Sequence, residues 1–385
     1  MSTSSYFKQI REKAAALGGF FNAHLHLDRS GTHDATKRML QKVGRSRENS
    51  SLSLSAKHAL IPSIHASECY SPQSLMNRGR AYLEELIDSG TTRADTLVDV
   101  TLDNVALVGL EVYLSLKNEY QADIDLRVAA YSPLGFKDSE PGRWKLLEEA
   151  AQLADFIAGL PERDDHENYP DHIGFEESCR RMFELSFQLG KPLHLHVDQK
   201  NLSSENGAER ALSVMTTMNN LPSFAKGQDA LIWFVHMISS ASYEESRFAR
   251  LLSNLASHHV GVICCPSAAI SMRQHRPRLT PTHNSIARVL DLLATGIPVR
   301  IGSDNICDIT SPAGTTDLVD ELFVLCNTIR FYDIEILSKL AAGISLSHTE
   351  QIQIKTHLEN DHEETLQALA QERESTFQPR IFKTA

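Results

Sequence analysis

The chain has 385 residues, 42% hydrophobic and 23% charged, a composition typical of a globular protein with a substantial core. Its formal net charge of −11 argues against a non-specific nucleic-acid binder, which needs a basic surface to displace counterions. No apolar run approaches the roughly 20 residues that span a bilayer, and residues 1–17 lack an apolar signal core. With six irregularly spaced cysteines, read as reduced thiols, we expect a cytoplasmic protein without a membrane partner.

Short apolar runs recur along the chain and predict buried parallel strands. They are rich in Val, Ile, Leu and Phe and mostly do not alternate with polar residues, as in strands covered on both faces. The runs are Gly19–Ala23, Thr96–Val100, Leu126–Tyr131, Asp155–Leu160, Pro192–Val197, Leu231–Val235, Val260–Cys265 and Pro298–Gly302.

Amphipathic stretches lie between these runs and predict helices, several of which stop at a glycine such as Gly190. The expected helices are Leu75–Ser89, Asp103–Gln121 (with Asp103 or Asn104 as N-cap), Glu140–Leu153, Phe175–Leu189, Glu205–Asn219, Ser242–Ser257 and Asn284–Thr295. Strands alternating with helices in this way favour a (β/α)8 barrel, a TIM barrel of the α/β class. A doubly wound sheet with a cap is the competing architecture.

Further segments surround the predicted barrel. Residues 1–17 are expected to form a polar helix, and the Ser-rich stretch 32–67 a long loop over the end of the first strand. After residue 332 the chain is expected to be mostly helical, with a strongly charged stretch at 350–373. We therefore divide the chain into a barrel, residues 1–345, and a helical C-terminal extension and tail, residues 346–385.

Histidine and aspartate residues stand at the ends of the first, fifth, sixth and eighth predicted strands. His24 and His26 are separated by one residue, so their side chains share one face of the first strand. His196, His236 and Asp304 end the fifth, sixth and eighth strands. Because the carboxyl ends of barrel strands meet at one mouth, these side chains are expected to converge there.

These residue types suit a single divalent metal ion. Imidazole nitrogens and a carboxylate are ligands that both Zn²⁺ and Fe²⁺ accept, so the sequence does not separate the two metals. We expect His24, His26, His196 and Asp304 as ligands. A metal-bound hydroxide would then attack an sp² carbon, with Asp304 as general base and His236 stabilising the oxyanion.

With these residues in place, the chain resembles the amidohydrolase superfamily, and within it the cytosine deaminase-like branch, which includes aminohydrolases of triazine rings. The resemblance covers residues 20–332 and extends to the segments TLVDVT (96–101), ADFIAGLP (154–161) and GSDNICD (302–308). It implies the same barrel and the same metal ligands, with His236 as the polarising histidine.

The chain also departs from that branch at positions that bear on the reaction. The branch has a proton-shuttling Glu three residues after the ligand His, where this chain has Gln199, whose amide cannot carry a proton at neutral pH. Asp198 and Glu162 are the candidate replacements. Asn305 stands where the branch has an Asp, so cytosine itself is not expected as the substrate. The branch's β-sandwich, built from both chain ends, is not expected here, because the first strand begins near residue 20.

The sequence also predicts a substrate contact, a buried position or a surface position for a few more polar residues. Ser267 is a candidate substrate contact, as are Glu162 and Asn305. His194 is expected to be a buried packing residue and His65 to lie at the surface. The basic cluster after the seventh strand reads as a solvated loop, with recognition of a carboxylate as the alternative; it consists of Arg273, Arg276 and Arg278.

The sequence thus predicts a metal-dependent hydrolase of a C–N bond in a small nitrogen heterocycle, of the deaminase or aminohydrolase type. The first alternative is an amidase or other C–N hydrolase that releases a substituted amine or a carboxylate, since Asp304 can pass its proton directly to the leaving nitrogen. The second is a non-catalytic relative that lost the shuttle at Gln199. A small-molecule substrate is the expected partner, and a homo-oligomer is left open.

Overall fold

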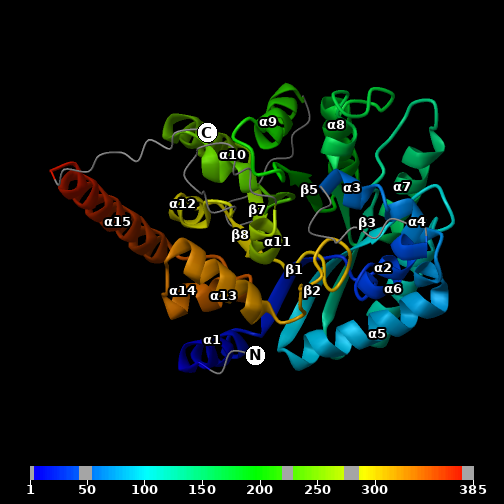
Figure 1. The fold of residues 1–385 in the computed structure, drawn as a ribbon, viewed down its shortest axis with the longest axis horizontal. Coiled ribbons are helices and arrows are strands. Elements are labelled where there is room, and N and C mark those ends of the chain that lie inside the picture. Colours follow the sequence, from blue (N-terminus) through cyan, green and yellow to red (C-terminus); the bar gives the residue numbers. More distant parts are fainter. Residues whose placement is uncertain (1–3, 43–53, 219–228, 273–285, 375–385) are drawn as a thin grey trace, which may run out of the picture.

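A computed structural model describes residues 4–42, 54–218, 229–272 and 286–374, and within these residues the strands form one parallel sheet (Figure 1). The sheet has eight strands in the order β1 to β8, each paired in parallel with the next along the chain. The strands are β1 Phe20–Leu25, β2 Thr91–Asp99, β3 Asp125–Tyr131, β4 Phe156–Gly159, β5 Leu193–Val197, β6 Ile232–His236, β7 Val260–Cys264 and β8 Val299–Ile301. Most of their residues are buried, as the apolar runs predicted.

The sheet is nearly closed into a barrel, and the closing contact lies at the residues singled out from the sequence. Just beyond β8, the backbone N–H of Asp304 donates to the carbonyl of His24 at 2.8 Å, and His26 N–H donates to the carbonyl of Asp304 at 3.2 Å. Leu25 and Asp304 form an isolated parallel bridge. The expected (β/α)8 barrel is therefore confirmed.

Helices alternate with the strands and cover the barrel. The α-helices are α1 Ser5–Ala16, α2 His33–Lys42, α3 Leu54–His58, α4 Ile61–His65, α5 Pro72–Asp88, α6 Val108–Glu119, α7 Gly142–Leu153, α8 Phe175–Leu189, α9 Gly207–Thr217, α10 Glu245–Ser257, α11 Pro266–Ile270, α12 Val289–Ala294, α13 Leu318–Ile329, α14 Ile334–Ala341 and α15 His348–Glu374. Short 3₁₀ turns are η2 Glu68–Tyr70, η3 Pro161–Arg163 and η4 Ile238–Ser242. Gly190 ends α8 with φ +61°, a left-handed conformation that glycine adopts without strain.

Two expectations about local structure were wrong. Helix α6 begins at Val108 with Leu107 as its N-cap, because the side chain of Asp103 instead accepts from Val105 N–H and pairs with His65. The stretch 32–67 is not a plain loop, since α2, α3 and α4 lie within it; residues 43–53 fall outside the described part of the chain.

The terminal helices lie outside the barrel. Helix α1 packs against α14, and α15 begins against α12 and then leads away from the barrel (Figure 1). Residues 359–370 of α15 are all exposed. This helix confirms the expected helical C-terminal segment, while the division of the chain at residue 345 stays a prediction. Residues 376–385, expected to be a loose tail, are not among those described.

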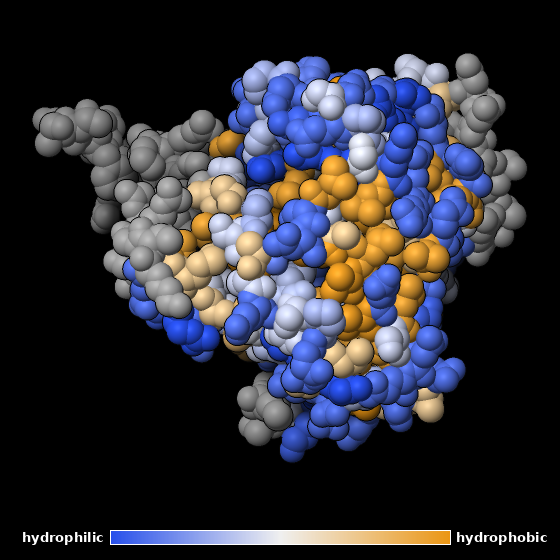
Figure 2. All heavy atoms as spheres, turned by 90° about the vertical axis from the view of Figure 1, so that its right-hand side faces the viewer, coloured by the Kyte–Doolittle hydropathy of each residue, from blue (hydrophilic) through white to orange (hydrophobic). Residues whose placement is uncertain are grey.

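One side of the molecule has an apolar area framed by polar residues (Figure 2). Helices α6 and α7 lie on this side, and Leu153, the last residue of α7, is 54% exposed. Exposed apolar patches of this kind are often protein contact surfaces. Among the helices described, none combines the length and the apolar character needed to cross a membrane.

Candidate metal centre and active site

The predicted site residues meet at the carboxyl end of the barrel. His24 lies on β1 and His26 directly follows that strand. His196 lies on β5, His236 ends β6, and Asp304 follows β8. His236 and Asp304 have φ values of +77° and +61°, which non-glycine residues rarely adopt. Such strain at strand ends is typical of functional sites, where the backbone is bent to aim side chains.

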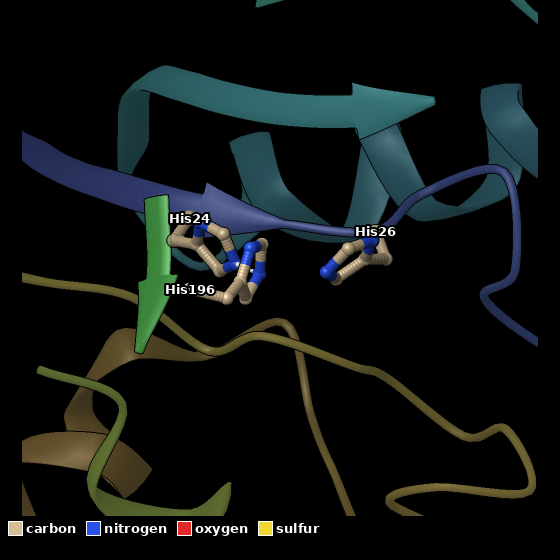
Figure 3. Close-up of side chains that lie close together, drawn as sticks. All are labelled: His24, His26 and His196. Carbon is tan, nitrogen blue, oxygen red and sulfur yellow. Dashed lines mark hydrogen bonds between the residues drawn. The ribbon is translucent and has the colours of Figure 1, made fainter. Parts of the chain in front are cut away.

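Three buried imidazoles form the centre of the site (Figure 3). The Nε2 atoms of His24 and His196 lie 3.1 Å apart, and His26 stands beside them with its ligand nitrogen in the same group. The Nδ1–H of His196 can donate to the carbonyl of Gly159 at 3.0 Å, which leaves the Nε2 lone pair facing His24. Burial lowers the pKa of His24 and His26 far below the usual range and that of His196 to about 4, so all three are neutral.

The carboxylate of Asp304 completes the cluster. Its Oδ1 lies 3.4 Å from Nε2 of His26 and 3.8 Å from Nε2 of His24. The ligand atoms of His24, His236 and Asp304 form a second group within 4.8 Å. Burial, reinforced by the carboxylate of Asp308, raises the pKa of Asp304 to about 8. A buried acid next to neutral imidazoles is strongly disfavoured as an anion unless a cation compensates it.

The geometry fits a metal ion. Two ligands about 2.0–2.1 Å from one cation lie roughly 2.9–3.4 Å apart at right-angled to tetrahedral geometry, and the nitrogens of His24 and His196 are 3.1 Å apart. The Nδ1 atoms of His24, His26 and His236 are buried without a hydrogen-bond partner in the described structure. His24, His26, His196 and Asp304 therefore offer the donor set expected from the sequence.

A cavity of about 400 Å³ opens beside this cluster. Its lining includes seven of the predicted site residues: His26, Glu162, His196, Gln199, His236, Asp304 and Asn305. The amide of Gln199 donates to the carboxylate of Glu162 at 3.2 Å. Burial and the nearby carboxylate of Glu205 raise the pKa of Glu162 to about 8, so this group holds a proton near neutral pH.

Three other predicted residues have different surroundings. Both carboxylate oxygens of Asp198 accept from the backbone of α9, at Gly207 N and Ala208 N, and Asp198 does not line the cavity. This placement argues against Asp198 as the proton shuttle. Asn305 lines the cavity and donates to Asp308, whereas Ser267 does not line it; its backbone N–H donates to Glu321.

The structure also brings residues to the cavity that the sequence reasoning missed. Arg29, Tyr131 and His58 all line it. The ring of Tyr131 stands 5.4 Å from that of His26 and 5.3 Å from that of His196. Tyr131 ends β3 and Arg29 follows the HxH motif closely, so their positions at strand ends were the available signal.

Two further histidines, His194 and His65, had expected positions. The expectation for His194 agrees with the structure, and the one for His65 was wrong. His194 is fully buried, one layer below His196, and packs at 4.5 Å against the ring of Phe156. His65, expected at the surface, is only 3% exposed and lies between the carboxylates of Asp99 and Asp103, at 2.9 and 2.8 Å. Arg273, Arg276 and Arg278 lie outside the described residues.

Comparison with known proteins identifies relatives of this fold. No protein-family model matches the chain. A pterin deaminase from Rhizobium rhizogenes is 20% identical over 244 residues, which are 63% of this chain and 52% of that protein. The chain thus matches about half the length of that relative.

Solved structures match over more of the chain. A 5-methylcytosine deaminase from Klebsiella pneumoniae, liganded with 5-fluorocytosine, superimposes with a TM-score of 0.67 at 23% identity, covering 82% of this chain and 70% of that one. N-isopropylammelide isopropylaminohydrolase from Burkholderia multivorans gives a TM-score of 0.61 at 19% identity, covering 84% and 74%. The chain therefore has the fold of these two enzymes, as the resemblance seen in the sequence led us to expect.

Proposed function

We propose that this protein is a metal-dependent amidohydrolase that hydrolyses a C–N bond in a small nitrogen heterocycle, with release of ammonia. The observation that carries the proposal is the cluster of His24, His26, His196 and Asp304 at the mouth of the barrel, next to a cavity of about 400 Å³. The fold shared with heterocycle deaminases supports the same conclusion. A cavity of this size suits a small, largely buried ligand.

One divalent cation, Zn²⁺ or Fe²⁺, would be held by these four residues. When bound, it would act as a Lewis acid and lower the pKa of water in the site. The neutral imidazoles supply lone pairs without prior loss of a proton, because burial keeps their pKa values low. Asp304 is placed to accept the proton of the attacking water, and His236 to donate a hydrogen bond to the developing oxyanion.

The departing amine needs a proton, and we assign its delivery to Glu162. The raised pKa of Glu162, about 8, keeps it protonated near neutral pH, as a general acid requires. Gln199 occupies the position of the branch's glutamate and donates to Glu162 at 3.2 Å. Gln199 would therefore orient the acid, and Glu162 would move the proton.

The test is ammonium release by the metal-loaded protein from a panel of aminated pyrimidines, purines, pterins and triazines. His196→Ala is the control that disrupts the metal site. Ammonium from the wild type and none from the variant would support the proposal. Bound metal without ammonium from any compound would favour the alternative, a C–N hydrolase that releases a substituted amine or a carboxylate. Ligand binding without any hydrolysis would favour the non-catalytic relative.

We also propose that the enzyme is a cytoplasmic homo-oligomer. Its six cysteines are all free, as in proteins of reducing compartments. The apolar area on the side of α6 and α7, the latter ending at the exposed Leu153, supports contact with a second copy. Size-exclusion chromatography with light scattering tests this: Leu153→Glu should lower the assembled mass, and a wild-type monomer would refute it.

A further inference from the structure

The cavity is lined by more cations than its proposed chemistry uses. Arg29, Lys57, Arg163 and Lys200 line it, against Glu162 and the metal-binding Asp304 as acidic groups. Lys57 donates to the carbonyl of Thr310 at 3.0 Å, and Lys200 lies 3.8 Å from Glu205. The two arginines have a different arrangement.

The guanidinium of Arg163 has no carboxylate partner in the described part of the chain. It ends η3, stacks at 4.3 Å over the ring of Tyr169 and donates Nη1 to the hydroxyl of the same tyrosine. Its Nε is buried and makes no hydrogen bond within the described structure. A cation held by an aromatic ring at the wall of a cavity retains its charge for a ligand.

The guanidinium of Arg29 is fixed by an ion pair, and its Nη1 is available to a ligand. Its Nε and Nη2 donate to both oxygens of Asp99, at 2.8 and 2.5 Å. Nη1 has no hydrogen-bond partner among the described residues, and the guanidinium carbon is 5.7 Å from the ring centre of Tyr131. A side-on pair of this kind fixes the plane of the guanidinium and aims its remaining N–H groups.

Arg29 and Arg163 line the same cavity, and so does His58. Burial first, then the charges of Arg29 and Arg163, lower the pKa of His58 to about 3. His58 is therefore neutral, and it adds no third positive charge to the cavity wall. The charge of Arg29 is balanced by Asp99, whereas Arg163 has no carboxylate partner among the described residues. An anionic substituent would therefore match Arg163 better than a neutral heterocycle would.

We propose that Arg163 and Arg29 form an anion subsite, and that the substrate is an aminated heterocycle carrying a carboxylate. This inference rests on the proposed function, because it assigns the specificity of the same cavity. The forked guanidinium of Arg163 would bind the carboxylate oxygens, and Nη1 of Arg29 would donate to them from its fixed position. The metal cluster and Glu162 would then face the ring that bears the amine.

The experiment measures binding apart from turnover. Calorimetry on the metal-loaded protein compares two pteridine-2,4-diones that lack an exocyclic amine, one unsubstituted and one with a 6-carboxylate. We expect the carboxylate to bind at least about tenfold more tightly, and Arg163→Gln to remove on the order of 10- to 100-fold of its affinity, the range for a charged hydrogen bond. Arg163→Gln should lower the affinity for the uncharged compound much less than the affinity for the carboxylate.

Two controls complete the design. Arg181→Gln makes the same change of charge on α8, where Arg181 pairs with Asp138 and Glu177 and does not line the cavity, and it should bind both compounds as the wild type does. Arg163→Lys, which keeps the charge without the fork, should fall between wild type and Arg163→Gln. Equal affinity of the wild type for the two compounds, or no binding of the carboxylate, would overturn the subsite.

The outcomes separate this inference from the proposed function. Tight binding of the carboxylate with no ammonium from any amine would keep the subsite and reject deamination. Ammonium release from neutral and carboxylated heterocycles alike, with no effect of Arg163→Gln, would keep deamination and reject the subsite.

Discussion

The backbone N–H of Asp304 donates to the carbonyl of His24 at 2.8 Å, while the carboxylate of Asp304 lies 3.8 Å from Nε2 of the same histidine. One pair of residues therefore closes the barrel through its backbone and offers metal ligands through its side chains. The backbone bond that joins the first strand to the chain after the last one is thus made by two of the proposed metal ligands, and it fixes their relative positions. The backbone of Asp304 therefore has a structural role, and its carboxylate has a chemical one.

We therefore expect Asp304→Asn to retain the fold and lose the reaction. The backbone bonds to His24 and His26 do not involve the side chain, so the circular dichroism spectrum should stay that of the wild type. Turnover should fall about 10²- to 10⁴-fold, the range for loss of a general base. Asn305→Ala, a change at the next residue, should have a smaller effect on turnover. Full activity of Asp304→Asn would exclude the proposed base.

The two histidines of β5 should differ in their effect on the metal. His196→Ala removes a ligand and should lower bound metal, measured by elemental analysis after dialysis, well below one equivalent. His194→Ala removes a ring that packs against Phe156, so the metal content should persist while stability falls by about 1–3 kcal/mol. Loss of metal in His194→Ala with an intact fold would make His194 a ligand.

The pH profile should report the acid form of Glu162. Because its pKa is raised to about 8, the protonated acid is present below that pH and disappears above it. We expect kcat/KM for ammonium release to decline as the pH rises through about 8. Glu162→Gln should lower turnover about 10²- to 10⁴-fold and remove this alkaline limb. If Glu162→Gln still showed the decline above about pH 8, a group other than Glu162 would be responsible for it.

Much of the fold was predictable because its signals are local. Each of the eight apolar runs overlaps a strand, and Phe175–Leu189 was predicted to the residue, since an apolar face and a terminal glycine mark its length. The strand-end histidines were predictable as a group because parallel strands end at one mouth. The start of α6 was not, because Asp103 makes a tertiary contact with His65 that a local capping rule does not contain.

The rest of the site depends on contacts between distant segments. Asp198 looked equivalent to Glu162 as a shuttle, yet its oxygens accept from a helix start nine and ten residues later. His65 was assigned to the surface because it lies in the stretch 32–67, interpreted as a loop. Its partners lie on and just after β2. These contacts depend on how distant segments pack together in three dimensions. The composition of the chain and the spacing of its residues do not contain that information.

Asp198 should matter for stability more than for chemistry. Its carboxylate accepts two backbone N–H groups at the start of α9, at 2.6 and 3.0 Å, and so acts as a cap. Asp198→Ala should lower the free energy of unfolding by about 1–2 kcal/mol, measured by urea denaturation. At temperatures where the variant is folded, its turnover should stay within a few-fold of wild type. A loss as large as that of Glu162→Gln would return the shuttle role to Asp198.

The buried His65 should make stability depend on alkaline pH. Burial alone would lower its pKa, but hydrogen bonds to Asp103 and Asp99 raise it to about 9, above the roughly 6.5 of an unfolded chain. A folded-state pKa above the unfolded one means that the contribution to stability is complete below about pH 6.5 and is lost as the pH rises through about 9.

Thermal melts of the wild type between pH 6 and 10 should therefore show a fall in melting temperature across this window. His65→Gln keeps a hydrogen-bonding side chain without the charge, so it should be less stable than wild type at pH 6 and should lose much of the slope. His258→Gln changes a half-buried histidine at the C-cap of α10; it is the matched control and should keep the slope. Parallel curves for wild type and His65→Gln would show that the charge of His65 does not stabilise the fold.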